Sequence, residues 1–208
     1  DVDLMINDGL WCPFETWHMG NTGEVVSEKY QIGRGTQDEY AYNSHRKAME
    51  ARDGGTFDDE IIPVAIPQRK GDPIVFSKDE TIRDDTSVAG LGKLRPAFKR
   101  DGGTVTAGNA PGVNDGASAV MVTSAEKAKE LGAEPLGKIV AYATSGIEPT
   151  LLMMAPVQGV KNVLDKAGWS MDEVDLFELN EAFSVQALGV MQELGMDMSK
   201  VNVNGGAV

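Results

Sequence analysis

Short apolar runs alternate with segments of helical spacing along the second half of the chain. Strands are predicted at four apolar runs, residues 117–122, 139–144, 174–179 and 201–203. Helices are predicted over about 123–132, 156–167 and 181–194, each of which ends at or just before a glycine. Capping boxes of the form Ser/Thr-x-x-Glu occur at 123–126 and 170–173. Strands that alternate with helices of this length predict α/β layering.

The first half is rich in turns. Clusters of glycine, proline and aspartate occur at residues 33–35, 53–55, 70–73, 101–103 and 108–112. One helix is predicted from a capping box at 36–39 to about Arg52. The segment 59–75 alternates prolines with β-branched residues, which predicts extended segments and loops. This half is interpreted as an irregular subdomain laid over another layer, where substrate loops are usually found.

Composition and charge exclude several classes of protein. The 208 residues are 41% hydrophobic and 25% charged, as in ordinary globular proteins. No apolar run approaches the roughly 20 residues that a membrane helix needs. The net charge of −13 argues against nucleic acid or an anionic membrane as the main partner. No signal peptide is visible, and the scarcity of cysteine fits a reducing compartment, so a cytoplasmic location is expected.

Cys12 is the only cysteine, which excludes an internal disulfide and a multi-cysteine metal site. His18 and His45 are the only histidines, so no metal site is predicted. Cys12 lies beside Pro13 in a predicted loop near His18, which raises a Cys/His catalytic pair as an alternative. An incidental loop thiol is the preferred interpretation, because no motif surrounds it.

Cations gather in one part of this acidic chain. Residues 93–100 hold four of them, and Arg69, Lys70 and Arg83 precede that segment. A solvated basic loop is one interpretation, and a binding place for phosphate groups is the other. An acidic protein that binds a polyanionic ligand needs such a local cluster.

The sequence Asn-Glu-Ala-Phe at 180–183 follows an apolar run and opens a predicted helix. Asn180 is a good N-cap residue, which is one explanation of its place. The carboxyl end of a strand is also where α/β proteins place reacting groups. A further observation concerns the end of the chain, Asn-Gly-Gly-Ala-Val at 204–208, which is a strand-to-loop transition. The sequence is therefore interpreted as a fragment.

Several motifs together resemble the thiolase family. They occur in the family's order from end to end of the chain, at residues 8–10, 17–20, 93–98, 103–117, 176–183 and 201–208. The Trp-His-Met-Gly sequence at 17–20 is similar to biosynthetic members. The resemblance implies the thiolase fold, an α/β fold of two similar halves in which mixed sheets are layered with helices. It implies a loop (CoA-binding) domain at 1–112, the end of the N-terminal half at 113–133 and a truncated C-terminal half at 134–208.

The resemblance also implies a chemistry. Thiolases join two acetyl-CoA molecules into acetoacetyl-CoA, or cleave a 3-ketoacyl-CoA with CoA. One cysteine carries the acyl group and a second moves a proton, while fixed donors stabilise the developing oxyanions. No separate cofactor is implied, because coenzyme A thioesters are the substrates. Asn180 matches the asparagine that holds a catalytic water, a task that suits a neutral amide.

Further positions match the substrate channel of the family. His18 matches the histidine beside the pantetheine arm, Met19 its neighbour in the acyl pocket, and Arg83 the arginine near the adenine. The remaining expected substrate-binding residues are Leu10, Phe98, Ala107, Pro111, Leu152 and Phe183. Relatives are dimers or tetramers, so a homo-oligomer is expected.

Departures from the family pattern matter. Pro111 replaces a serine of many members and has neither a hydroxyl nor a backbone N–H. Met153 and Met154 stand where relatives are often glycine-rich, and either pack in the core or narrow the acyl pocket. The nucleophilic cysteine, the Gly-His-Pro histidine and the Cys-Gly-Gly cysteine are absent, so the chain alone is expected to be inactive. A non-catalytic thiolase-like protein that binds acyl-CoA or lipid is the alternative function.

Overall fold

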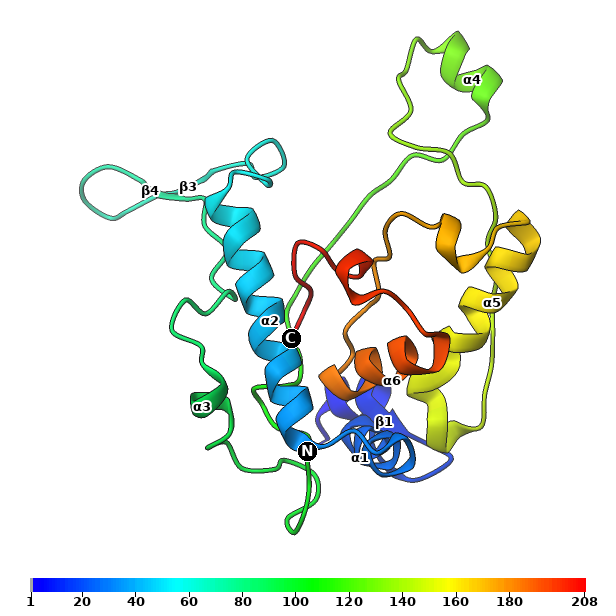
Figure 1. Ribbon diagram of the computed structural model, residues 1–208. Coiled ribbons are helices and arrows are strands. Elements are labelled where there is room, and N and C mark those ends of the chain that lie inside the picture. The colour runs from blue at the N-terminus through cyan, green and yellow to red at the C-terminus, as the bar shows by residue number, and fades with distance from the viewer. Residues whose placement is uncertain (1) are drawn as a thin grey trace.

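The computed structural model describes residues 2–208. Its centre is made of the helices α1 (Met19–Tyr30), α2 (Arg34–Asp53), α5 (Ala155–Ala167) and α6 (Ser184–Leu194). Helix α6 packs against the other three (Figure 1). A 3₁₀ segment, η2 (Pro149–Met154), lies against α1 and α6 and completes this group.

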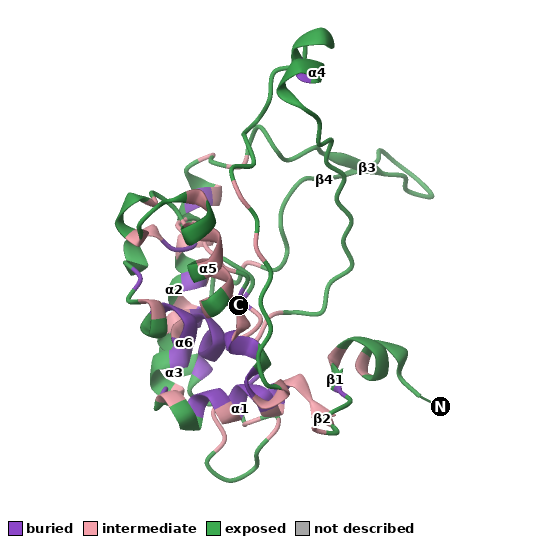
Figure 2. Ribbon diagram, turned by 90° about the vertical axis from the view of Figure 1, so that its right-hand side faces the viewer, coloured by how far each residue is buried: buried purple, intermediate pink, exposed green. Residues whose placement is uncertain are grey.

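The main hydrophobic core lies between α1, η2, α6 and the loop that contains Val105. Burial colouring shows that the buried residues concentrate on α1 and α6 (Figure 2). The large apolar side chains that are at most 2% exposed are Val26, Val105, Met154, Val185, Val190 and Val201. Burial of one such side chain is worth about 1.5–3 kcal/mol, so this cluster is the main source of stability.

Helix α2 begins earlier than the sequence predicts. Its first residue is Arg34 after Gly33, so the predicted capping box at 36–39 is wrong. The guanidinium of Arg34 is held by the Leu91 carbonyl at 2.6 Å and by the Asp38 carboxylate at 2.7 Å. The ion pair within the helix and the contact to Leu91 stabilise three more residues of helix than a cap at Thr36 predicts.

Helix α6 begins later than predicted, at Ser184 instead of about Glu181. The Ser184 backbone N–H donates to the Asn109 carbonyl at 3.0 Å. Phe183 therefore has the N-cap position that the sequence offers to Asn180. The predicted end is confirmed, because Gly195 closes the helix in the left-handed conformation that glycine favours.

Two other predicted helices are confirmed. Helix α5 ends at Gly168, which has φ of 72°. Helix α4 (Ala125–Glu130) is capped by the Ser124 hydroxyl instead of Thr123. The predicted Ser170–Glu173 capping box is present, and it opens the short 3₁₀ segment η3 (Met171–Glu173). The remaining short helical elements are η1 (Met5–Leu10), α3 (Val88–Leu91) and η4 (Met198–Lys200).

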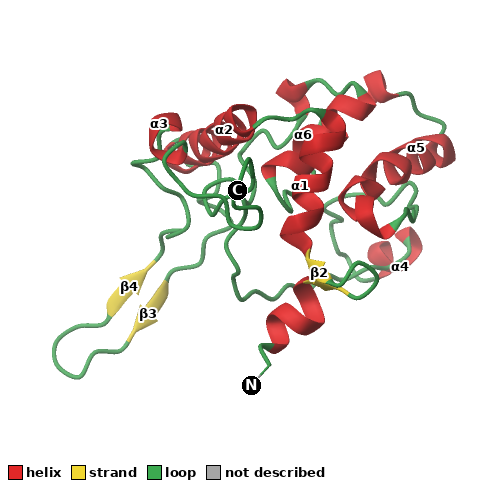
Figure 3. Cartoon of the chain, turned by 90° about the horizontal axis from the view of Figure 1, so that it is seen from below, coloured by secondary structure: helices red, strands yellow, loops and turns green. Residues whose placement is uncertain are grey.

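The strands form two small antiparallel ladders. One joins β1 (Trp11–Cys12) to β2 (Trp17–His18), and the other joins β3 (Val64–Ile66) to β4 (Ile74–Phe76). The second ladder lies inside the segment for which extended structure is predicted. Its six residues are all exposed, and the hairpin projects away from the helices (Figure 3).

The four strands predicted in the second half do not form a sheet within residues 2–208. Residues 117–122 and 139–144 are extended loops without a ladder partner in the described chain. Between the other two runs a single parallel bridge joins Phe177 to Val201. Its hydrogen bonds run from the Phe177 N–H to the Lys200 carbonyl, 2.8 Å, and from the Asn202 N–H to the Phe177 carbonyl, 2.9 Å. The two runs and α6 between them have the order strand–helix–strand. The unit is incomplete, because only one residue pair is bridged and no ladder forms.

An apolar groove marks where one unpaired run meets its helix. It has a volume of about 370 Å³ and lies between residues 138–141, the α5 face that carries Val160 and Leu164, and Phe177. The apolar run and the apolar face of α5 thus lie together, as α/β layering requires, although no ladder fixes them.

The accessible surface is large for the size of the chain. It measures 14,271 Å², whereas a compact monomer of this mass exposes about 9,400 Å². Part of the excess is the unpaired apolar runs, in which Val120 is 87% and Tyr142 is 78% exposed. Within residues 2–208 no helix is both long and apolar enough to cross a membrane.

The isolated 208-residue chain is therefore expected to be poorly stable. Exposed apolar runs cannot contribute burial energy, and they favour association. Differential scanning calorimetry of the isolated chain should show no cooperative thermal transition. A sharp, concentration-independent transition would contradict this expectation.

Candidate functional site

Three aromatic side chains from distant segments meet at the start of α1. The rings of His18 and Phe98 are stacked, with centroids 4.8 Å apart and planes at 25°. Phe183 approaches Phe98 edge-on, with centroids 6.5 Å apart and planes at 86°. Such stacked and edge-on pairs are favourable beyond the area that they bury. The structure thus brings together three of the residues predicted to line the substrate channel.

Gly20 makes this cluster possible. A Cβ atom at position 20 would lie 2.1 Å from the Phe98 ring, a distance that no real contact has. Met19, beside it, packs against the main core and joins the cluster to α1. The Trp-His-Met-Gly sequence therefore has a packing reason for its glycine.

His18 is held as a neutral hydrogen-bond donor. Its Nδ1 accepts from the Gly20 backbone N–H at 3.0 Å, which caps α1. Burial lowers the pKa of the imidazole below its usual value of 6.5. In a neutral ring whose Nδ1 accepts, the proton is on Nε2. His18 can therefore donate from Nε2 to a carbonyl or amide oxygen of a ligand.

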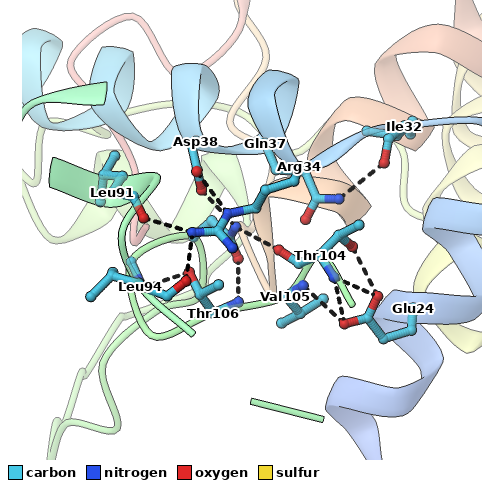
Figure 4. Close-up of polar contacts among 12 residues, drawn as sticks. Glu24, Ile32, Arg34, Gln37, Asp38, Leu91, Leu94, Thr104, Val105 and Thr106 are labelled. Carbon is cyan, nitrogen blue, oxygen red and sulfur yellow. Dashed lines mark hydrogen bonds and ion pairs between the residues drawn. The ribbon is translucent and has the colours of Figure 1, made fainter. Parts of the chain in front are cut away.

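Buried polar contacts fix the loop that contains Ala107 and Pro111. Glu24 of α1 accepts from the Thr104 and Val105 backbone N–H groups, each at 2.9 Å (Figure 4). A Thr104 hydroxyl donates to the same carboxylate at 2.9 Å. A buried carboxylate is tolerated when donors surround it, so Glu24 and this loop stabilise each other.

A second buried contact joins the same loop to α2. The Asn109 amide donates to Asp38 at 2.9 Å, and its oxygen accepts from the Thr106 N–H at 2.8 Å. Asp38 also accepts from Arg34, whose guanidinium reaches the carbonyls of Leu91 and Leu94 (Figure 4). Because the Asn109 carbonyl accepts from Ser184, the loop lies directly beside the N-terminus of α6 and Phe183.

Asn180 is exposed, three residues before Phe183. Its neighbour Glu181 is 2% exposed and accepts five hydrogen bonds, which the local sequence does not reveal. The sequence does contain one signal for the contact between Glu181 and residues 206–208. Gly205 and Gly206 are adjacent, and a Cβ at 206 would lie 2.1 Å from the Glu181 carboxyl carbon. A glycine pair after a strand can therefore mark a close approach.

The other predicted site residues lie on different elements. Leu10 ends η1 and is half-buried, and Leu152 of η2 is 44% exposed. Arg83 is exposed, and its backbone N–H donates to His45 of α2 at 3.3 Å. Burial and the Arg83 charge lower the pKa of His45.

The geometry of β1 and β2 disfavours a Cys12/His18 pair. Cys12 is 3% exposed and opposes Trp17, while His18 opposes Trp11. Adjacent ladder positions point to opposite faces, so the thiol and the imidazole diverge. Over the described residues 2–208, no group of three or more His, Cys, Asp or Glu side chains is arranged to hold a metal ion.

Comparisons with known proteins cover the whole chain. Residues 1–126 match the thiolase N-terminal domain and residues 133–208 match the thiolase C-terminal domain. The chain belongs to the thiolase family. It has the thiolase fold: the crystal structure of the Bacillus anthracis acetyl-CoA acetyltransferase superposes with a TM-score of 0.89 at 45% identity, over 95% of this chain and 50% of that one.

The similar curated proteins are named as acyltransferases. An acetyl-CoA acetyltransferase of Chromobacterium violaceum is 54% identical over 100% of this chain and 53% of its own length. A probable acetyl-CoA acyltransferase of Staphylococcus aureus (strain COL) is 50% identical over 100% of this chain and 52% of its own. The chain thus spans about half the length of the curated relatives it matches.

The packing at Gly20 can be tested by Gly20→Ala. The new methyl group must displace Phe98 from His18, and overpacking of this kind costs about 1–3 kcal/mol. Chemical denaturation should show this loss, and the His18 resonances should lose the ring-current shift from Phe98. Gly35→Ala is the matched control, because nothing lies within 4 Å of a Cβ there. An unchanged His18 spectrum in Gly20→Ala would contradict the stacked arrangement.

The state of His18 can be tested by NMR titration of ¹³C-histidine in the full-length protein, with His18→Gln to assign the signal. We expect a midpoint below 6.5, because burial disfavours the imidazolium. Near its pKa, His18 then binds fewer protons in the folded state than in the unfolded state. The stability that neutral His18 contributes is therefore fully present above the unfolded pKa of about 6.5. It is lost as the pH falls from there through the lower folded pKa. A midpoint at or above 6.5 would refute the burial argument.

Proposed function

We propose that the whole protein to which this chain belongs is an acetyl-CoA C-acetyltransferase. It condenses two acetyl-CoA molecules to acetoacetyl-CoA, or cleaves a short 3-ketoacyl-CoA with CoA, through an acyl-cysteine. The observation that carries the proposal is the aromatic cluster in which Phe98 stacks on His18 and meets Phe183 edge-on, with Asn180 three residues before Phe183 in the chain. These residues match substrate-channel and catalytic positions of the family, and the relatives' names agree with this activity.

The residues have distinct proposed roles. His18 donates from Nε2 to the pantetheine arm of CoA, and the Phe98 and Phe183 rings form an apolar wall beside it. Met19 and Leu10 line the acyl channel, with Leu152 on η2. Ala107 and Pro111 contribute the loop that Glu24 and Asn109 hold in place.

The nucleotide end of CoA is assigned to the exposed cations. Arg83 is exposed and is proposed to stack on the adenine, since a guanidinium both stacks and attracts phosphate. Lys93, Arg95 and Arg100 are also exposed. They provide the positive charge that a polyanion needs on a chain of net charge −13.

Asn180 is the proposed catalytic residue of this chain. Its exposed amide orients a water molecule, which donates to the oxyanion that forms at a thioester carbonyl. The nucleophilic cysteine, the histidine and the acid/base cysteine of the family are assigned to sequence outside residues 1–208. Cys12 is buried in β1 and is not proposed as a substitute, so the 208-residue chain alone is expected to be inactive.

Short acyl chains are the proposed substrates. Met153 and Met154 are 8% and 1% exposed and pack in the main core, so the core interpretation of these methionines is favoured. Pro111 removes a donor that many relatives have near the thioester. Neither the two methionines nor Pro111 is thus an argument for short acyl chains. The proposed preference for acetoacetyl-CoA rests on the similarity of the Trp-His-Met-Gly segment to biosynthetic members of the family.

We further propose that the full-length protein is a cytoplasmic homo-oligomer that uses CoA thioesters without a separate cofactor. The large exposed apolar surface of this chain supports burial against further protein.

The test begins with the coding sequence on both sides of this segment. The full-length protein should contain the nucleophilic cysteine and the Gly-His-Pro and Cys-Gly-Gly motifs, and should cleave acetoacetyl-CoA, measured by loss of its ultraviolet absorbance. Free CoA should protect the reactive cysteine from alkylation. A protein with intact flanks that binds CoA but lacks those residues and turnover would be the non-catalytic acyl-CoA-binding relative.

Asn180→Ala in the full-length protein should lower kcat by about 10²–10³-fold, because one oxyanion-hole donor is lost. Asn43→Ala, at an exposed asparagine of α2, is the control and should leave kcat unchanged. Steady-state thiolysis of acetoacetyl-CoA gives both values. A kcat within twofold of the unmodified protein in Asn180→Ala would refute the role of this residue.

A further inference from the structure

Glu181 is a buried carboxylate that receives donors from three parts of the chain. Its Oε1 accepts from the Tyr40 hydroxyl at 2.7 Å and the Asn202 amide at 2.8 Å. Its Oε2 accepts from the Ser44 hydroxyl at 3.1 Å and from the backbone N–H groups of residues 207 and 208 at 2.7 and 3.0 Å. All five partners are donors, which matches the acceptor-only chemistry of a carboxylate.

Asn202 extends this arrangement to the other side of Asn180. Its side-chain oxygen accepts from the Leu179 N–H, and its amide donates to the Leu179 carbonyl, both at 2.8 Å. Asn202 has φ of 44°, a left-handed conformation that asparagine adopts more readily than most residues. One amide side chain thus holds the residues before and after Asn180.

Asn180 and Glu181 are adjacent in the chain but differ in burial. Glu181 is 2% exposed, whereas Asn180 is exposed, as in an extended chain whose successive side chains point to opposite sides. With Leu179 and Glu181 both held, the backbone on either side of Asn180 is fixed, and with it the direction of the Asn180 Cα–Cβ bond.

The same carboxylate also determines the path of residues 205–208. Gly206 donates its N–H to Ser44 at 2.9 Å, and a Cβ atom there would collide with Glu181. Burial and the Glu181 charge both raise the pKa of Tyr40, so its hydroxyl keeps its proton and remains a donor. The hydrogen bond from Tyr40 to Glu181 therefore keeps its donor over the whole neutral range.

We propose that Glu181, together with Asn202, is the positioning residue of the site: its buried carboxylate holds Asn180 and the backbone of residues 205–208 in one fixed arrangement. The inference rests on the proposed function, because it assigns Glu181 an effect on turnover through Asn180. Glu181 itself touches no substrate in this role.

The test uses Glu181→Gln in the full-length protein, measured by steady-state thiolysis of acetoacetyl-CoA and by thermal unfolding. Glutamine keeps the shape but presents an NH₂ group to a set of donors, so Asn180 should lose its fixed direction. We expect kcat to fall at least about tenfold with KM changed less than about threefold, because positioning acts on the transition state more than on binding. Glu181→Asp keeps the charge, but its shorter side chain cannot reach the donors of both oxygens. Its kcat should therefore also stay below that of the unmodified protein.

The control separates positioning from loss of stability. Val190→Ala removes a fully buried side chain of α6 and should lower the melting temperature without changing kcat at temperatures where the protein is folded. Tyr40→Phe removes one of the five donors and should lower kcat about threefold or more, which keeps the test available if Glu181→Gln does not fold. Unchanged kcat in the folded Tyr40→Phe and Glu181→Gln proteins, or a raised KM alone, would overturn the proposal.

An independent readout distinguishes this failure from failure of the proposed function. Hydrogen exchange of the Ala207 and Val208 amides should speed up in Glu181→Gln, whether or not the protein turns over. If the unmodified protein has no thiolase activity, the proposed function fails, and the role of Glu181 in turnover fails with it. If that protein is active and the variant exchanges faster but keeps its kcat, only the positioning role is refuted.

Discussion

Helix α2 holds the parts of the molecule together through two buried carboxylates. Asp38, near its start, takes up the Asn109 amide and the Arg34 guanidinium. Further along, Tyr40 and Ser44 donate to Glu181. A buried carboxylate costs several kcal/mol unless donors surround it. Here α2 supplies some of the donors, and the loop at 104–109 and residues 202–208 supply the others. The loop at 104–109 is therefore fixed by its contact with Asp38, and residues 202–208 are fixed by their contacts with Glu181. The candidate site lies beside both segments.

Helices were more predictable than strands in this chain. Helix α5 has the predicted extent and ends at Gly168, because helical spacing and a C-terminal glycine are local signals. The sequence predicts the start of α6 about three residues too early, because the contact of Ser184 with Asn109 is not visible in the local sequence. The strands predicted at 117–122 and 139–144 are absent, because an apolar run is a local signal whereas pairing is a property of two segments. Within residues 2–208 neither run has a partner for a ladder.

The candidate site was partly predictable for a related reason. Motif resemblance identifies His18, Phe98 and Phe183, and the structure brings their rings together although they are far apart in the sequence. It did not identify the buried acids, Glu24 and Glu181. In the sequence these look like ordinary helix and surface residues. Their donors are backbone N–H groups, which every residue type offers, and side chains far away in the sequence, such as Tyr40 and Ser44 for Glu181.

The contact between Tyr40 and Glu181 has a consequence for biosynthesis. The two residues are 141 positions apart, so the ribosome completes α2 well before it adds the carboxylate. At ordinary elongation rates that interval is about 7–28 s. At the start of this interval, the α2 hydroxyl donors lack their carboxylate and Asp38 lacks its Asn109 partner, while the strand–helix–strand unit around α6 does not yet exist. The contacts of Tyr40 and Ser44 with Glu181 can therefore form only after residue 181 has been added, so they cannot stabilise α2 earlier in synthesis.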